Sequence, residues 1–214
     1  CPAGSARALI PNQSRTAEPL QTNKLKVSPK ARREFIAAVT RRAAAFGLTA
    51  KEIKPNREEG ELVIIDGQPH PRRIGRQRAR LAERIGQHGF EPVMEAAAYT
   101  WFNRLIAIRY MELHGYLDHG FRVLSHPEGH GRPEILERAA EVDLPGLDPD
   151  EVVALKLDGT KDEELYRLLV KAQCNALHNA MPFLFERVGD ETELLLPANL
   201  LHSDSLVRQL VESI

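Results

Sequence analysis

The stretch EAAAYTWFNRLIAIRYMELHGY, Glu95–Tyr116, decides the fold of this chain. Its apolar residues fall on two adjoining stripes at helical spacing, so we expect a helix that is buried on most sides. One stripe comprises Trp101, Leu105, Ile108 and Met111, and the other comprises Ala98, Phe102, Ile106 and Tyr110. The stretch holds the only Trp of the chain, which raises the alternative of a binding site. The apolar surround favours a core role for Trp101.

Three polar residues, Asn103, Arg104 and Arg109, interrupt the apolar surface of this helix. Buried polar groups need hydrogen-bond partners. The acidic residues of the second half of the chain can supply them, so structural ion pairs are expected here rather than a site.

The segments before this helix predict a first helix, a hairpin and an arginine-rich helix. Residues 28–47 have helical apolar spacing and end at a glycine. The β-branched run Leu62–Ile65 is followed by Asp66-Gly67, which is a strong hairpin turn signal. Two prolines in the next four residues confine the second arm to a sheet edge. Residues 72–89 then form a helix with Arg on most of its faces.

The segments after Tyr116 are richer in turns. Residues 119–150 hold one short helix, at about residues 133–140. A second long helix follows, and Pro182 is expected to kink or break it. Residues 191–201 are expected to be extended or turn-like. A last helix has Ser203 as its expected N-cap.

The predicted fold class is therefore mainly α: a helical domain with one small β-hairpin and no nucleotide-binding sheet. No β-α-β alternation is visible, which argues against a doubly wound sheet. The two long helices are expected to pack together around Trp101, and the predicted core comprises Trp101, Phe102, Leu105, Leu177 and Phe183.

Charge is distributed unevenly along the 214 residues, although the net charge is only −1. Residues 1–90 hold 18 Lys and Arg against eight Asp and Glu, and residues 91–214 hold 11 against 22. We expect residues 1–21 to be a disordered leader or a vector-derived extension. Residues 22–214 form the helical domain, with a basic part at 22–90 and an acidic part at 91–214. Either the basic part meets a polyanion, or the two parts attract each other in the fold.

The composition also indicates the cellular compartment in which the protein functions. No apolar run approaches the roughly 20 residues that span a bilayer, so no membrane contact is expected. The chain has only two Cys, Cys1 and Cys174, which excludes a disulfide framework and favours the cytoplasm.

The arginine-rich helix is the strongest candidate for a nucleic-acid contact. Guanidinium groups match phosphate oxygens in a planar, two-pronged geometry. A solvated charged face is the alternative reading of the same pattern. The candidate DNA-binding residues are Arg72, Arg73, Arg76, Arg78, Arg80 and Arg84.

Two other groups are weaker candidates. Four histidines, with Asp118 and Glu128 between them, could ligate a metal, but they lie in a turn-rich segment and we predict no metal site. These histidines are His114, His119, His126 and His130. Cys174 and His178 are four residues apart on a helix, close enough to pair. Their apolar neighbours favour a buried, inert thiol over a catalytic thiolate.

Three blocks of this sequence resemble one known family, the PglX-type adenine-specific DNA methyltransferases of the BREX phage-defence systems. The blocks are AYTWFNRLIAIRYMELHGY (98–116), ALHNAMPFLFERVGDETELLLPANLL (176–201), and TNKLK with ARREFIAAV (22–26 and 31–39). The resemblance covers roughly residues 22–214, and it places them near the start of such a protein.

The resemblance implies a parent enzyme that methylates adenine N6 in DNA with S-adenosylmethionine and so marks host DNA as self. This chain departs from the family pattern, because no Asn is followed by Pro and the Asn-Pro-Pro-Tyr box is missing, as is a Gly-rich cofactor loop. No catalytic or cofactor-binding residue is therefore assigned, and the fragment itself is expected to be inactive. The implied partners are DNA, the catalytic domain of the same protein and other phage-defence subunits. An assembly scaffold without DNA contact is the alternative function.

Overall fold

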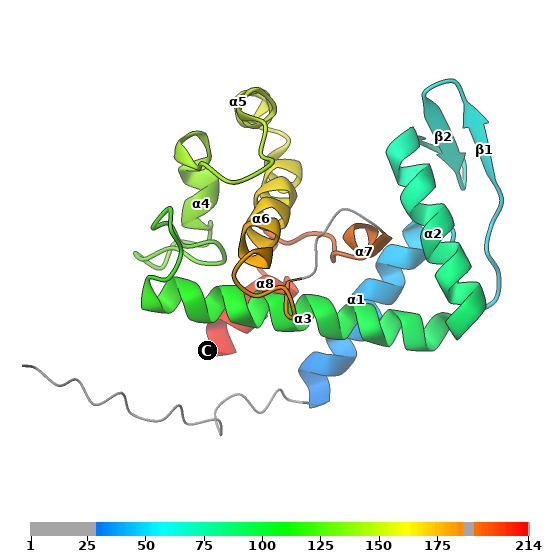
Figure 1. Cartoon of the computed structure of the whole chain (residues 1–214), viewed down its shortest axis with the longest axis horizontal. Coiled ribbons are helices and arrows are strands. Elements are labelled where there is room, and N and C mark those ends of the chain that lie inside the picture. Colours follow the sequence, from blue (N-terminus) through cyan, green and yellow to red (C-terminus); the bar gives the residue numbers. More distant parts are fainter. Residues whose placement is uncertain (1–28, 186–190, 214) are drawn as a thin grey trace, which may run out of the picture.

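In the computed structural model, helix α3 (Phe90–His114) is the longest helix within the described residues and extends across much of the view (Figure 1). The structure describes residues 29–185 and 191–213. Helices α1 (Pro29–Ala45), α2 (Arg72–His88) and α8 (Leu206–Ser213) all contact α3. The chain leaves α3 at Gly115, which has the left-handed φ of 66° that glycine adopts without steric cost. The central helix predicted from Glu95–Tyr116 is thus confirmed.

A small antiparallel sheet packs beside α2 at one end of the molecule (Figure 1). It contains β1 (Asn56–Glu59), β2 (Leu62–Ile65) and β3 (Gln68–Pro71) in that order. The turn between β2 and β3 has positive φ at Asp66 and Gly67, which is the geometry that favours this dipeptide. The predicted hairpin and its edge position are confirmed, and β1 is an additional strand.

Helix α2 approaches the sheet closely at Gly75. A Cβ atom at this position would lie 3.1 Å from Val63 Cγ1, so glycine allows the helix and β2 to meet. The contact covers a small apolar cluster of Phe46, Val63, Ile65 and Leu194. The glycine that lowers helix propensity in α2 therefore has a packing role.

The second half of the molecule contains α4 (Glu134–Glu137), a 3-10 turn at Ala139–Glu141, α5 (Pro149–Asp158) and α6 (Asp162–His178), and α6 contacts both α4 and α5. Helix α5 was not predicted, although its start carries a standard signal. Asp148 caps it by accepting a hydrogen bond from Asp150 N at 3.0 Å, and Pro149 follows. Helix α6 ends four residues before Pro182, so the predicted break is confirmed.

Two predictions about the C-terminal segments are wrong. Residues expected to be extended include a short helix, α7 (Glu191–Leu194), which packs against α2. The N-cap of α8 is Ser205 rather than Ser203, since Ser205 Oγ accepts a hydrogen bond from Arg208 N at 3.1 Å. Ser205 is buried while Ser203 is exposed, so only Ser205 is positioned at the helix start.

Four of the five predicted core residues are buried in one large apolar cluster: Trp101, Phe102, Leu105 and Leu177. The fifth prediction, Phe183, is wrong, because its side chain is 85% exposed. Helix α6 has already ended at His178, so helical spacing no longer determines which side chains beyond it face inward. Phe185 is fully buried instead, and its carbonyl oxygen lies 2.7 Å from His178 Nδ1.

The predicted mainly α fold with a small β element is therefore confirmed. None of the helices within residues 29–185 and 191–213 has the length and hydropathy needed to cross a membrane. The positions of residues 1–28, including the predicted leader, lie outside the described part of the chain.

Candidate functional site

The arginines of α2 do not form one uniform face. Arg78 lies on the buried side and is only 3% exposed. Its guanidinium donates to Phe46 O at 2.7 Å, to Asn56 Oδ1 at 3.0 Å and to Lys54 O. It thereby joins α2 to the end of α1 and to β1. Burial lowers the pKa of Arg78, although an arginine remains charged in this setting. Arg78 has a structural role and is withdrawn from the predicted DNA-binding set.

Three further arginines of α2 are exposed but paired with carboxylates. Arg72 Nη2 lies 3.2 Å from Glu58 Oε2 of β1. Arg73 and Arg84 face α7, at 3.7 Å from Glu193 and 3.5 Å from Glu191 respectively. These pairs attach α7 to α2 across more than 100 residues of sequence. They support the alternative in which the basic and acidic parts of the chain attract each other.

Arg76 and Arg80 are the remaining candidates. Both are exposed, and neither makes a hydrogen bond or ion pair with any residue in the described ranges. They are four positions apart and so lie on the same face of α2. That face is opposite the buried residues Leu81 and Ile85. These two guanidinium groups are available to a ligand, and whether they contact nucleic acid stays a prediction.

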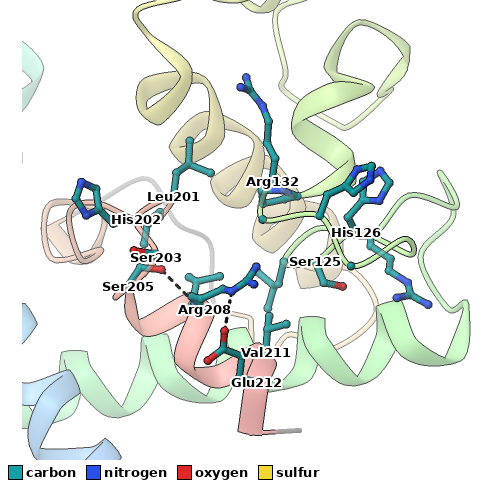
Figure 2. Close-up of a pocket in the computed structure, with 18 of the residues that line it drawn as sticks. Ser125, His126, Arg132, Leu201, His202, Ser203, Ser205, Arg208, Val211 and Glu212 are labelled. Atoms are coloured by element: carbon teal, nitrogen blue, oxygen red, sulfur yellow. Dashed lines mark hydrogen bonds and ion pairs between the residues drawn. The ribbon is translucent and has the colours of Figure 1, made fainter.

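A second candidate lies at the far end of α3, where sequence reasoning placed no site. A cavity of about 610 Å³ opens between the loop at residues 125–133 and the start of α8 (Figure 2). We call it the α8 pocket. Its lining includes one carboxylate, Glu212, and four arginines: Arg109, Arg122, Arg132 and Arg208. Three histidines and three serines also line it: His126, His130, His202, Ser125, Ser203 and Ser205.

The floor of the α8 pocket rests on a buried ion pair. Arg109 Nη1 lies 2.7 Å from Glu112 Oε1, one turn further along α3. The Glu112 carboxylate also accepts hydrogen bonds from Leu124 N at 2.7 Å and from Ser125 Oγ at 2.9 Å. The expectation that Arg109 makes a structural ion pair is thus confirmed. The network attaches the loop to α3.

Trp101 and Arg104 occupy the centre of α3. Trp101 is fully buried, and its Nε1 donates to Thr192 O of α7 at 3.0 Å. The Arg104 guanidinium lies 5.3 Å from the Trp101 ring centroid, within the range of a cation–π contact. The indole is therefore enclosed on all sides and has no face available for a ligand.

The four histidines considered for a metal do not gather at one point. His114 stacks on Tyr110 with ring centroids 4.1 Å apart, and His119 Nε2 lies 2.7 Å from Gln173 Oε1. His126 and His130 do meet, with ring centroids 4.4 Å apart.

Two carboxylates approach this pair, and Glu128 Oε2 lies 3.3 Å from His130 Nε2. The other is Glu137, whose ligand atom lies within 4.8 Å of those of both histidines. However, His126 Nδ1 accepts a hydrogen bond from Glu128 N at 3.1 Å, so a neutral ring carries its proton on Nε2. That Nε2 lies 3.5 Å from Glu137 Oε2. A neutral ring that bound a metal through Nε2 would carry its proton on Nδ1, and the hydrogen bond from Glu128 N would be lost because a backbone N–H cannot accept. The arrangement favours hydrogen bonding, and the absence of a metal stays a prediction.

Cys174 lies in the core, fully buried on α6. Burial raises the pKa of its thiol to about 12, and the Arg104 charge only partly opposes this shift. His178 makes no hydrogen bond to this thiol within the described residues; its Nδ1 lies 2.7 Å from the Phe185 carbonyl oxygen. This geometry supports the prediction that Cys174 is a buried, unreactive thiol.

The native chain is therefore expected to resist alkylation of Cys174 at pH 8, whereas the urea-unfolded chain should react readily. An unperturbed thiol with a pKa of about 8.5 is partly ionised at that pH. In the folded chain the Cys174 thiol stays protonated up to a pH of about 12, whereas in the unfolded chain it ionises above about 8.5. Ionisation therefore favours the unfolded chain, and the fold loses stability as the pH rises from about 8.5 to about 12. The measurement is the mass of the peptide that carries Cys174 after timed iodoacetamide treatment. Equal rates for native and unfolded chain would contradict the inert assignment.

No family model matches the sequence. Two curated relatives do match it over most of its length. The chain is 48% identical over 204 residues to the adenine-specific methyltransferase BrxX of Escherichia coli O9:H4 (strain HS), which covers 91% of the chain. It is 33% identical over 205 residues to the adenine-specific methyltransferase PglX of Lacticaseibacillus casei (strain Zhang), which covers 86% of the chain.

The chain spans only 17% of the length of each of these two relatives. The match therefore relates it to a part of those proteins, and their activity does not follow from it. The predicted resemblance is confirmed at this level: this chain is a homologue of one segment of the adenine-specific methyltransferases BrxX and PglX.

Proposed function

We propose that this chain is the DNA-contacting helical domain of an adenine-N6 DNA methyltransferase that marks host DNA in phage defence. Homology to BrxX and PglX supports the methyltransferase assignment. In this proposal the parent enzyme uses S-adenosylmethionine, bound by residues outside this chain. The role of the domain is to hold the duplex while the methyl group is transferred elsewhere in the enzyme.

The observation that carries DNA contact is the outer face of α2. Arg76 and Arg80 are exposed, adjacent on one face and without a partner among the described residues. Arginine binds phosphate oxygens through two parallel N–H groups. The part of the chain at residues 1–90 also has an excess of ten basic groups, which attracts a polyanion from a distance. Contacts of this kind position the backbone and do not select a base sequence.

Replacing Arg76 and Arg80 together with alanine is expected to weaken duplex binding about tenfold or more at low salt, since each charge-assisted hydrogen bond contributes about 1.5–3 kcal/mol. The slope of log affinity against log salt should become shallower by about 2, because each lost phosphate contact removes roughly one unit. Fluorescence anisotropy of a labelled duplex over a salt series measures both quantities. The loss should be the same for duplexes of different sequence.

The matched control is Lys156→Ala with Lys161→Ala, which also removes two positive charges from exposed positions but at the α5 end of the molecule. This control separates a local contact from a general loss of charge. If the α2 variant binds duplex as tightly as the parent chain, or if the control loses as much affinity, α2 is not the contact surface.

A docking role is the second candidate, favoured by large apolar side chains on the surface. Phe183 is 85% exposed, Leu157 81% and Tyr99 68%. In this alternative the domain docks on the catalytic domain of the same protein or on another defence subunit. Apolar docking changes little with salt, whereas phosphate contacts weaken steeply. A partner complex that persists in high salt and is lost on Phe183→Ser would favour this second role.

A further inference from the structure

The α8 pocket has the opposite charge to the part of the chain that forms it. Residues 91–214 hold 11 basic and 22 acidic residues, so a surface that followed this composition would present two carboxylates for each basic group. The pocket lining instead holds four of those 11 basic residues and one carboxylate, Glu212. Of the four, Arg109 pairs with Glu112 and Arg132 pairs with Asp162, outside the lining. A local reversal of charge inside a concave site concentrates anions there.

The guanidinium groups come from both walls of the pocket. Arg208 extends from α8 toward the loop that carries Ser125 and Arg132 (Figure 2). Its Nη1 would lie 3.9 Å from a Cβ atom built at Gly131, so it reaches across to that loop. Arg122 lies on the chain that leads into the same loop. An anion between the walls could therefore be contacted from two sides.

Two of these arginines are available for a ligand. The Arg122 guanidinium makes no hydrogen bond or ion pair within the described residues. Only the backbone of Arg122 is engaged, since its N–H donates to Glu134 and its carbonyl oxygen accepts from Ile135 N. Arg208 pairs only with Glu212, at 2.8 Å and four positions away on the exposed side of α8. Exposed pairs of this type stabilise a helix only weakly, so a stronger acceptor can displace the carboxylate.

Arg109 contributes a buried positive charge to the floor of the pocket. This residue is only 8% exposed, and its Nη1 is held by Glu112 and Ser125. Its Nη2 donates to Val211 O of α8 at 3.4 Å. Arg109 therefore fixes the floor of the pocket, and the contacts to a ligand fall to the more accessible arginines.

We infer that the α8 pocket binds a phosphate group, carried either by a free nucleotide or by a nucleic-acid backbone. Arg122 and Arg208 would contact the phosphate oxygens, and Ser125 and Ser203 are hydroxyl groups on the lining. The volume of about 610 Å³ lies within the range of small-molecule sites and has room for a nucleotide. This inference does not depend on DNA contact by α2.

The test compares the parent chain with Arg122→Ala plus Arg208→Ala, because neither side chain supports the core. Calorimetry with adenosine monophosphate and with inorganic phosphate, and anisotropy with a duplex, identify the source of the phosphate. We expect the double variant to lose about tenfold or more in affinity for at least one of these probes. Its melting temperature and its helical circular dichroism should match those of the parent chain.

The pattern across probes separates the two sources. Loss of adenosine monophosphate binding with duplex binding intact assigns the pocket to a free nucleotide. If the parent chain does not bind the nucleotide and the double variant loses duplex binding, the pocket is assigned to a nucleic-acid backbone. The Lys156→Ala plus Lys161→Ala variant should bind every probe as the parent does. If the double variant binds all three probes as tightly as the parent chain, or if the parent binds none of them, the inference is overturned.

Discussion

Trp101→Ala is expected to leave the chain unfolded or aggregated, because truncating a buried Trp typically costs about 3–5 kcal/mol. That loss is comparable with the whole stability of many domains. Trp101 is fully buried, joins α3 to α7 through its bond to Thr192 O, and presents its ring to the Arg104 guanidinium. Removing the indole would open a cavity beside a buried charge. Urea unfolding followed by circular dichroism measures the change.

The conservative control is Trp101→Phe, which keeps an aromatic ring but loses the N–H donor to Thr192 O. It should cost less than the alanine variant, because the smaller ring still fills much of the cavity and Thr192 O keeps its hydrogen bond from Leu195 N at 3.1 Å. Because Trp101 is the only Trp, native fluorescence tests the same assignment without mutation. Emission that is blue-shifted and protected from iodide is expected. A red emission maximum, or an alanine variant that unfolds at the parental urea concentration, would show that Trp101 is not a core anchor.

Glu112→Ala is expected to have the second large effect on stability, about 3–5 kcal/mol, because it leaves a buried charge on Arg109 without compensation. The Glu112 side chain is fully buried, and it also accepts the Leu124 N–H and the Ser125 hydroxyl. In the variant, Arg109 and these two donors would all lose the carboxylate that accepts their hydrogen bonds. The loop at residues 125–133 should loosen first, which urea unfolding combined with hydrogen exchange at Leu124 can detect.

Two variants control this experiment. Glu212→Ala removes an exposed carboxylate from an i,i+4 pair and should change stability by less than about 0.5 kcal/mol. Arg109→Met combined with Glu112→Leu removes both charges and should recover much of the loss, since a buried ion pair can be replaced by apolar groups of similar volume. If Glu112→Ala behaves like Glu212→Ala, the buried pair does not stabilise the fold.

Local patterns were sufficient to predict most of the helices and the hairpin. The apolar stripes of α3 and the Asp66-Gly67 turn are short-range signals that tertiary contacts did not alter. Strand β1 was missed because its residues, NREE, are all exposed and have no alternation of polar and apolar side chains. Phe183 was misplaced because helical spacing was continued past the end of α6.

The candidate sites were predicted less well than the fold. The burial of Arg78 had a signal in the sequence, since it precedes Leu81 by three positions and Ile85 by seven, and so shares their face of α2. The pairs that engage Arg73 and Arg84 involve α7, more than 100 residues away, and no local pattern indicates them. The α8 pocket combines segments around Arg109, Arg122 and Arg208, which only the tertiary fold brings together.

Helix α3 connects the two basic surfaces, which are Arg76 with Arg80 on α2 and the α8 pocket. From its junction with α2 to Arg109 on the floor of the pocket, the helix rises about 28 Å. A duplex of that length has roughly eight base pairs, at about 3.4 Å per pair. If one duplex reached both surfaces, contact at one would raise its effective concentration at the other. Two individually weak contacts would then bind with the avidity of a bivalent ligand.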